Sequence, residues 1–400
     1  MEVFLSDWLN LVLRWGHMIA GIGWIGTSFY FIGLDVSLRR RAGAREGVDG
    51  SAWEVHGGGF YHVEKYSVAP KELPEDLIWF KWEAYITWVT GFALLVVQYY
   101  FNASTYLIDP GVADLAPWQA IAISVTSLAV GWLLYDGLCR SPVGRHTVAL
   151  GLATFVLILA ASFLFTQIFS GRGALIHVGA FVGTIMAVNV FMIIIPGQKK
   201  VADALMRGEE PDPRHGAVAK QRSVHNTYLT LPVLLMMVSQ HYPMLTGHPH
   251  AWILVGLILV AGALVRHGFV RHEAGDALGK FAWAPAVAAV GFAVALVMTA
   301  PTTDLTKDPA LAALEVSDAE AEDIVATHCA NCHSANPAHE GFDDPPKDIA
   351  FDSLDEIRRY GGLIQQQAVA SDTMPLGNET GMTEEDRRRL GAWLIRQRGE

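Results

Sequence analysis

The sequence predicts an all-α protein in two parts, a polytopic transmembrane helix bundle of about eight spans and a small helical domain at the C-terminal end. Hydrophobic residues make up 52% of the 400 residues and charged residues only 17%, whereas an ordinary soluble domain carries about 25% charged residues. The charge is also uneven, because residues 1–300 are neutral overall and residues 301–400 hold the whole net charge of -11. Apolar runs recur through the neutral part and stop near residue 300.

The apolar runs approach the roughly 20 residues that are needed to cross about 30 Å of hydrocarbon. The first run is too long for the apolar region of a signal peptide, and the basic cluster Arg39 to Arg41 follows it instead of preceding it. It is therefore expected to remain in the mature protein as the first span. The eight runs cover residues 8–34, 82–101, 117–137, 147–169, 174–195, 226–245, 250–270 and 281–300.

The basic residues of the connecting loops predict the orientation in a lipid bilayer. The loops after spans 1, 3, 5 and 7 carry 17 Lys and Arg residues, and the loops after spans 2, 4 and 6 carry only Arg172. Loops rich in Lys and Arg stay in the cytoplasm, so an even number of spans places both termini on the outer face. Outside these short loops no basic patch is available for phosphates, which excludes nucleic acid as a partner.

The acidic C-terminal part is divided into a linker over residues 301–314 and a domain over residues 315–400, behind a transmembrane domain over residues 1–300. One helix is expected over about residues 318–328. A second is expected over about residues 384–398, with Thr383 as its N-cap and acidic residues in its first turn.

The C-terminal domain contains Cys329-Ala330-Asn331-Cys332-His333, which is the CxxCH pattern of covalent haem attachment. In this pattern Cys329 and Cys332 bind haem c through thioethers, and His333 is the proximal ligand of the iron. A chance match, a zinc site and a redox pair are the alternatives. The flanking helices favour haem, because a motif gains its meaning from its structural context.

Met374 is the expected ligand on the other side of the iron, because Pro375 stiffens the loop that presents it and Met/His ligation suits electron acceptance. Met382, one residue before the N-cap, is the alternative. A helix, CxxCH, a loop with Met and a closing helix form the plan of a small class I cytochrome c domain. Haem c is attached outside the bacterial cytoplasmic membrane, so the motif independently places this domain on the periplasmic side of that inner membrane.

Ionisable residues inside membrane spans are functional hypotheses by default. In the first span Arg14, His17, Gly21, Trp24 and Ser28 recur every three or four residues and so share one helix face. His17 lies roughly 13 Å inside the outer end of the span, which is too deep for easy contact with water. For His17 a functional role and a structural hydrogen bond remain equally open.

Several segments together carry a resemblance to a known family. They are Arg14-Trp15-Gly16-His17, residues 21–26, 54–61 and 79–85, the CxxCH motif, and Met374-Pro375-Leu376-Gly377-Asn378. The chain that carries them resembles the membrane-bound, cytochrome-c-coupled urate hydroxylases (PuuD type), which join an eight-span urate oxidase domain to a C-terminal cytochrome c.

This resemblance implies an oxidoreductase with urate as substrate and 5-hydroxyisourate as product. Urate would lose two electrons and gain a hydroxyl group from water, and the haem c of the protein itself would be the immediate oxidant. A soluble cytochrome c or a terminal oxidase of the respiratory chain would then take the electrons. A general base would assist the loss of protons, and cationic or amide donors would hold the anionic purine.

Two other functions remain open. In the first, the protein is a quinol-handling or oxidase-accessory electron-transfer subunit in which pairs of histidines hold a haem b. In the second, it is a transporter or an anchor that only displays a cytochrome. The sequence does not decide whether a haem b is bound in any of the three cases.

Two locations compete for the urate site. The preferred one is the outer half of the bundle, close to the cytochrome domain, with His17 and Arg14 as the candidate catalytic residues and Gln98, Gln167, His177 and His241 nearby. The other is the cytoplasmic loop with His56, His62, Glu64, Lys65 and Lys81. A site there would leave about 30 Å of bilayer for the electrons to cross, so we interpret this loop as a gate or a scaffold. Cys139 is expected to be an inert small residue at a helix end.

Overall fold

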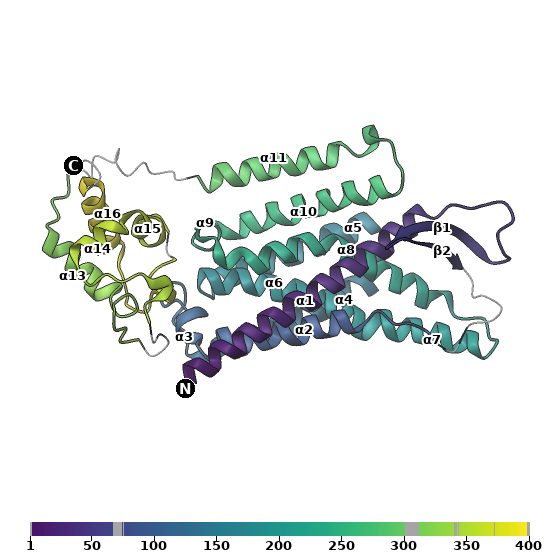
Figure 1. The fold of residues 1–400 in the computed structure, drawn as a ribbon, viewed down its shortest axis with the longest axis horizontal. Helices are drawn as coiled ribbons and strands as arrows, with labels where there is room; N and C mark the ends of the chain where they lie inside the picture. Colours follow the sequence, from purple (N-terminus) through teal and green to yellow (C-terminus); the bar gives the residue numbers. More distant parts are fainter. Residues whose placement is uncertain are drawn as a thin grey trace.

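A computed structural model describes residues 2–397 apart from 67–73, 75, 301–310, 312, 340, 341, 343 and 372. The described chain is mostly helical. A long helical bundle carries a two-stranded hairpin at one end and a separate helical unit, here called the tail, at the other end (Figure 1). Both ends of the chain lie at the tail end of the bundle.

The bundle consists of nine principal helices among the described residues, with two π-helical turns. The turn η1 (Val96–Tyr100) extends the helix that ends at Leu95, and η3 (Asn189–Ile194) joins the helix that ends at Val188 to the one that begins at Ile195. Short helices α3 (Ala103–Tyr106) and α9 (Pro243–Thr246) lie in loops. The principal helices are α1 (Glu2–Ser37), α2 (Trp82–Leu95), α4 (Pro117–Arg140), α5 (Thr147–Thr166), α6 (Gly171–Val188), α7 (Ile195–Met206), α8 (Pro213–Val238), α10 (Ala251–Glu273) and α11 (Trp283–Met298).

Five helices of the described chain are long and apolar enough to cross a membrane, in agreement with a membrane protein. They cover Asp7–Ser37, Pro117–Arg140, Thr147–Thr166, Gly171–Met206 and Ala251–Glu273. The three other predicted spans also fall on helices, namely α2 with η1, the second half of α8, and α11. These are shorter or more polar, so a total of eight spans stays a prediction.

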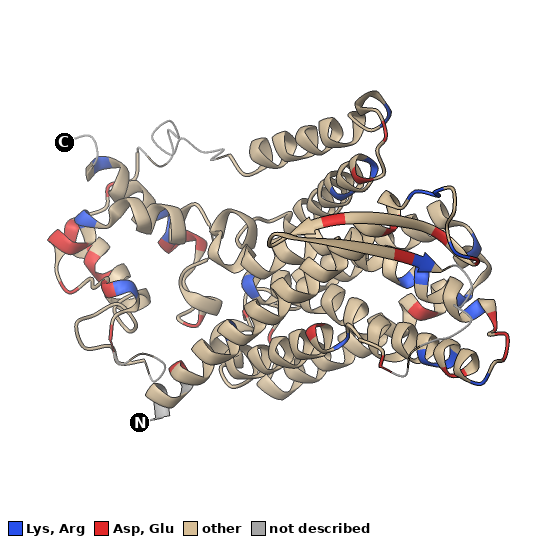
Figure 2. Ribbon diagram, turned by 45° about the vertical axis from the view of Figure 1, so that its right-hand side comes forward, with Lys and Arg blue, Asp and Glu red and all other residues tan. Residues whose placement is uncertain are grey.

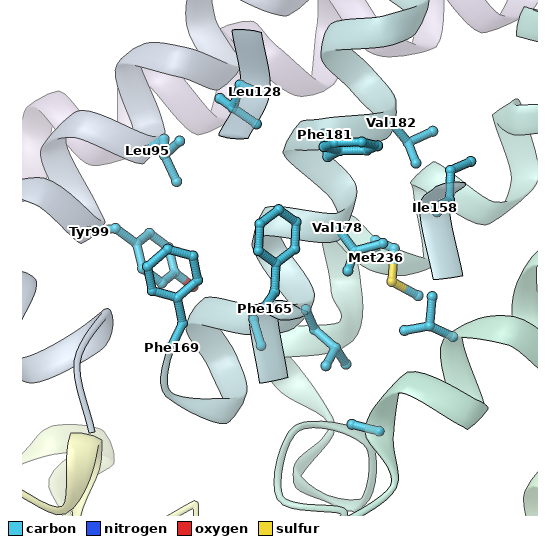
Figure 3. Packing of buried hydrophobic residues seen from close by; sticks show 14 of the residues in the cluster. Leu95, Tyr99, Leu128, Ile158, Phe165, Phe169, Val178, Phe181, Val182 and Met236 are labelled. Carbon is cyan, nitrogen blue, oxygen red and sulfur yellow. The ribbon is translucent and has the colours of Figure 1, made fainter. Parts of the chain in front are cut away.

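The core of the bundle forms around α6, which packs against α4, α5 and α8. Figure 3 shows aromatic and aliphatic side chains from these helices and from η1 meeting in one cluster. Gly131 lets α4 approach α6 closely, because a Cβ atom there would lie 2.0 Å from the Phe181 ring of α6. Lys and Arg gather at the hairpin end of the bundle (Figure 2), where the loop charges predicted the cytoplasmic side.

The hairpin corrects the expectation of a purely all-α protein. Strands β1 (Val48–His56) and β2 (Gly59–Tyr66) pair antiparallel. They are joined through Gly57 and Gly58, whose φ angles are 58° and 81°, as a two-residue hairpin turn requires. The cytoplasmic loop that the sequence predicted around His56 and Lys65 therefore contains regular structure over residues 48–66, apart from the turn.

The tail has its own hydrophobic core around Trp393, separate from that of the bundle. Its main helices are α13 (Asp318–His328), α14 (Leu354–Arg359), α15 (Gly361–Ile364) and α16 (Glu384–Gln397). The first and last of these match the two predicted helices, and the Thr383 hydroxyl accepts the N–H of Asp386 at 3.2 Å as the predicted cap. Most of the linker predicted over residues 301–314 lies outside the described residues.

Candidate functional site

The CxxCH motif begins where α13 ends, with Cys329 at the C-cap. The N–H of His333 donates to the carbonyl of Cys329 at 2.8 Å, so the motif folds into one tight turn. Both of its thiols are free of disulfide bonds. The Nδ1 of His333 lies 2.9 Å from the carbonyl of Ile349. Because a carbonyl only accepts, Nδ1 is the protonated nitrogen, which leaves the Nε2 lone pair for a metal ion.

The protonation of these groups fits attachment of a haem. Burial lowers the pKa of His333, although the Ile349 carbonyl opposes this shift, so at neutral pH the imidazole is in the neutral form that ligates iron. Burial also raises the pKa of the Cys329 thiol to about 12. A redox-active CxxC pair needs a lowered thiol pKa instead. Within the described residues no group of three or more His, Cys, Asp and Glu side chains could hold a metal ion, so the zinc interpretation gains no support.

The two candidate methionines lie in different surroundings. Met374 is half-buried in the loop before η9 (Leu376–Asn378), and its carbonyl accepts a hydrogen bond from Arg387 at 2.8 Å. Met382 is 3% exposed and belongs to the tail core with Leu390. A side chain packed in the core is less able to reach a haem iron than a side chain in a loop. This difference favours Met374 as the proposed iron ligand.

The tail meets the end of the bundle opposite the hairpin through that same loop. The Thr105 hydroxyl of α3 donates to the Glu379 carboxylate at 2.5 Å. Gly377 has a φ of 55°, and a Cβ atom there would lie 2.7 Å from the carbonyl oxygen of Ile108. A glycine therefore allows the loop after Met374 to rest directly on the backbone of the bundle.

The side chains of His17 and Arg14, both on α1, form hydrogen bonds with residues of α2 and η1. Arg14 donates to the amide oxygen of Gln98 at 2.6 Å. The Nδ1 of His17 lies 2.9 Å from the carbonyl of Thr87 and 3.1 Å from the hydroxyl of Thr90. By the same carbonyl argument Nδ1 carries the proton, so Nε2 of His17 keeps its lone pair and can act as a base.

Gly91 makes room for this imidazole. A Cβ atom at Gly91 would lie 2.8 Å from Cε1 of His17, closer than real Cβ atoms approach a ring. The placement of His17 thus depends on a glycine one turn beyond its hydrogen-bond partner on α2, a relation that the pattern of the first span could not reveal.

The other residues of the predicted outer site separate into different roles. His177 is fully buried, with Nδ1 2.6 Å from the Gly173 carbonyl and Nε2 2.5 Å from the Ser124 hydroxyl. Both nitrogens are therefore paired, and the residue is structural. Among the described residues, the Gln167 side chain forms a hydrogen bond only with its neighbour Thr166, at 3.4 Å. Among the described contacts His241 has none that joins it to His17 or Arg14.

The turn η1 links Arg14 to the surroundings of His177. Gln98 of this turn binds Arg14, and the next residue, Tyr99, places its ring 6.4 Å from the His177 ring. Tyr99 also donates to Gln240 at 3.2 Å. π-helical turns inside helices are frequent at functional sites, which adds weight to the outer location.

The side chains proposed for the alternative urate site, in the cytoplasmic loop, do not point toward one common position among the described contacts. They make separate contacts along the hairpin and beyond it. The His62 ring lies 4.6 Å from the Trp53 ring at a tilt of 34°, Glu64 lies 3.7 Å from Arg45, Lys65 pairs with Asp35 of α1, and Lys81 lies 5.4 Å above the Trp82 ring. His56 is exposed in the turn. These contacts indicate a scaffold fastened to α1.

The structure also forms a buried polar network toward the hairpin end that the sequence did not reveal. Asp136 accepts hydrogen bonds from Arg222 and from Arg140, both at 2.6 Å. Asn189 donates to Asn226 at 3.1 Å. Polar residues near the ends of three predicted spans were the available signal, but their meeting depends on how the helices are rotated. The charges of Arg222 and Arg140 are both paired with Asp136, although Nε of Arg222 has no hydrogen-bond partner among the described residues. The pairing of the charges points to a structural role.

Comparison with known proteins yields one finding. The family described as urate oxidase N-terminal matches residues 3–299, which include the bundle and the hairpin and end before the tail. No curated protein and no solved structure matches the chain.

Proposed function

Because the chain belongs to the urate oxidase N-terminal family, we propose that it is an integral membrane oxidoreductase that converts urate to 5-hydroxyisourate. Family membership suggests urate oxidation, and the five long apolar helices support a bilayer location. In the balanced reaction, urate and water yield 5-hydroxyisourate, two protons and two electrons. The family match favours this reaction over quinol oxidation.

The electrons need an acceptor, and the tail offers one. Cys329, Cys332, His333 and Met374 would hold a haem c, which accepts one electron at a time when it is bound. One observation supports haem binding by the tail. The Nδ1–H of His333 donates to the Ile349 carbonyl at 2.9 Å, which leaves Nε2 as the nitrogen that would bind iron. The contact of Gly377 with the backbone of the bundle keeps this loop beside the urate oxidase domain. A periplasmic tail and eight spans belong to the same proposal.

Within the bundle, His17 and Arg14 are the residues that would serve the substrate. The free Nε2 of His17 can remove a proton from urate as the electrons leave. Arg14 carries the charge that attracts an anionic purine, and Gln98 fixes the direction of its guanidinium group. Both residues lie in the half of α1 that faces the tail (Figure 1), so the electron path to the tail would be short.

The proposal is tested with membranes that contain the full chain and are kept free of oxygen. Added urate should lose its absorbance, and two haems should be reduced per urate consumed. A His333→Ala variant, which lacks the proximal ligand, should do neither. Reduction of the haem by a quinol but not by urate, together with a haem b signal in the reduced spectrum, would instead show the electron-transfer subunit.

The acidity of the tail leads to a separate prediction on the next electron acceptor. Residues 301–400 carry a net charge of -11, so a basic soluble cytochrome c or the basic face of a terminal oxidase should be attracted to the tail. The screening length falls from about 30 Å at 0.01 M salt to about 10 Å at 0.1 M. Electron transfer to such a partner should therefore slow on the order of 10-fold over this range.

Stopped-flow oxidation of the reduced tail by a basic cytochrome c measures this rate. Reduction of the tail by urate occurs within one chain and serves as the internal control, because it should hardly respond to salt. An outward rate that is indifferent to ionic strength would mean that the acidity only keeps the tail soluble.

A further inference from the structure

A small cavity of about 20 Å³ lies between the outer end of the bundle and the loop after Met374. The bundle side is formed by the end of α3, the start of α6 and the end of α9. The tail side is formed by η9 and the residues before it. The lining residues used below are Tyr106, Arg172 and Thr246 of the bundle and Thr373 and Gly377 of the tail.

Two buried polar atoms of this lining have no hydrogen-bond partner in the described chain. They are Nε of Arg172 and Oγ1 of Thr246, and Thr246 as a whole is only 5% exposed. Unpaired buried donors are rare in folded proteins because they lose their hydration without compensation. Two such donors at one cavity point to a ligand that supplies acceptor atoms.

The electric field at the cavity selects the charge of that ligand. Arg172 is the second residue of α6 and lies two positions after the N-cap Ser170, so its guanidinium charge adds to the positive end of the helix. Asp109 also lines the cavity, but its carboxylate accepts the N–H of Gly111 at 2.8 Å and forms no salt bridge with Arg172 among the described contacts. The Glu379 carboxylate beside the cavity is held by Thr105 and lies 3.0 Å from His339. Arg172 has no salt bridge among the described contacts, so an anion is the favoured ligand.

Tyr106 relates the cavity to the haem attachment motif. Burial raises the pKa of the Tyr106 phenol, the charge of Arg172 opposes this shift, and Cys332 and Glu379 add to it. The Tyr106 phenol therefore lies within electrostatic range of Arg172 on the bundle side and of Cys332 on the tail side. Thr373, which precedes the predicted iron ligand Met374, lines the same cavity.

We propose that Arg172 and Thr246 form a binding site for an anionic oxygen group. Resting on the proposed function, the ligand that fits best is a propionate carboxylate of the haem c in the tail. The cavity has room for roughly one or two water-sized groups, which suits the end of a carboxylate better than a purine ring. Arg172 is then a positioning residue by which the bundle orients the haem of the tail. An oxygen atom of the urate anion offers the same chemistry and is the second source that the experiment distinguishes.

The test uses the purified full-length holoprotein without urate. Arg172→Gln should lower the midpoint potential of the haem c, because loss of a nearby positive charge favours the oxidised iron. It should also shift the propionate bending band in the resonance Raman spectrum, which reports hydrogen bonding of that carboxylate. Arg172→Lys should keep most of the potential but not the band position, and Thr246→Val should move the band alone.

Arg145→Gln is the matched control, because this exposed arginine follows the far end of α4 and should change neither signal. Haem c content and the unfolding temperature identify any variant that has lost its fold, in which case Thr246→Val carries the test. An unchanged potential and band with a raised KM for urate would assign the site to urate. If neither signal nor the KM changes in Arg172→Gln, the site binds no anion and the inference is wrong. The potential and the band need no urate, so they hold even if urate oxidation is disproved.

Discussion

Replacing Met374 by Ala is expected to abolish the sulfur-to-iron charge-transfer band of the oxidised tail and to lower its midpoint potential by a few tenths of a volt. Axial ligands set haem potentials over a range of about 0.8 V, and a thioether raises the potential because it stabilises ferrous iron. Absorption spectra and a redox titration of the holoprotein measure both effects. Haem c content should stay the same, since Cys329 and Cys332 are intact.

Met382→Ala is the matched control for this variant. Met382 is 3% exposed in the tail core, and removal of such a side chain typically costs about 2–5 kcal/mol of stability. Met382→Ala should therefore lower the unfolding temperature of the tail and leave the charge-transfer band in place. A band that survives Met374→Ala and disappears in Met382→Ala would reverse the ligand assignment.

His17→Ala is expected to reduce kcat for urate oxidation by about 100-fold or more, the usual contribution of a positioned general base. Its Nε2 is the base in question, because Nδ1 is committed to the Thr87 carbonyl at 2.9 Å. Anaerobic urate consumption, in preparations with equal haem c content, is the measurement. The potential of the haem should not change, because His17 acts on the substrate.

Gly91→Ala provides a second view of the same residue. Its Cβ atom would push on the His17 ring from 2.8 Å, so activity should fall although the imidazole is still present. Thr90→Val removes one of the two partners of Nδ1 and should have a smaller effect, since the Thr87 carbonyl remains. Together the three variants separate loss of the base from its displacement.

Variants of the hairpin decide between the two locations for urate. His56 is exposed in the turn, and Lys65 pairs with Asp35 of α1, so His56→Ala should keep full activity and Lys65→Ala should mainly lower stability. Full activity in His17→Ala with a loss in both hairpin variants would move the site to the cytoplasmic side. A haem b signal that vanishes with His17 would make this residue an iron ligand instead.

Features that depend on neighbours along the chain could be predicted from the sequence. The apolar runs predicted a helix at each of eight positions, and the structure has a helix at each of them. This was possible because apolar length and composition are local properties. The closing helix of the tail begins after Thr383 as predicted, since an N-cap acts within one turn. The CxxCH motif was equally visible, because all the proposed haem-binding residues except Met374 lie within five consecutive residues.

Features that depend on distant segments were decided by the tertiary structure alone. The sequence grouped His177 with His17, but packing pairs both nitrogens of His177 with Ser124 and Gly173. Within the described part of the chain, the hydrogen bonds of the His17 ring go to Nδ1 and none goes to Nε2. The hairpin was missed because its pairing joins two strands across a glycine turn within a region that otherwise predicts only loop. The sequence marked Arg172 only as the single basic residue of the predicted outer loops. That its Nε is buried without a partner among the described residues, in a cavity between α6 and η9, is known only from the structure. The reason is common to all three, since a hydrogen bond between segments depends on the rotation and spacing of packed elements, which no local pattern encodes.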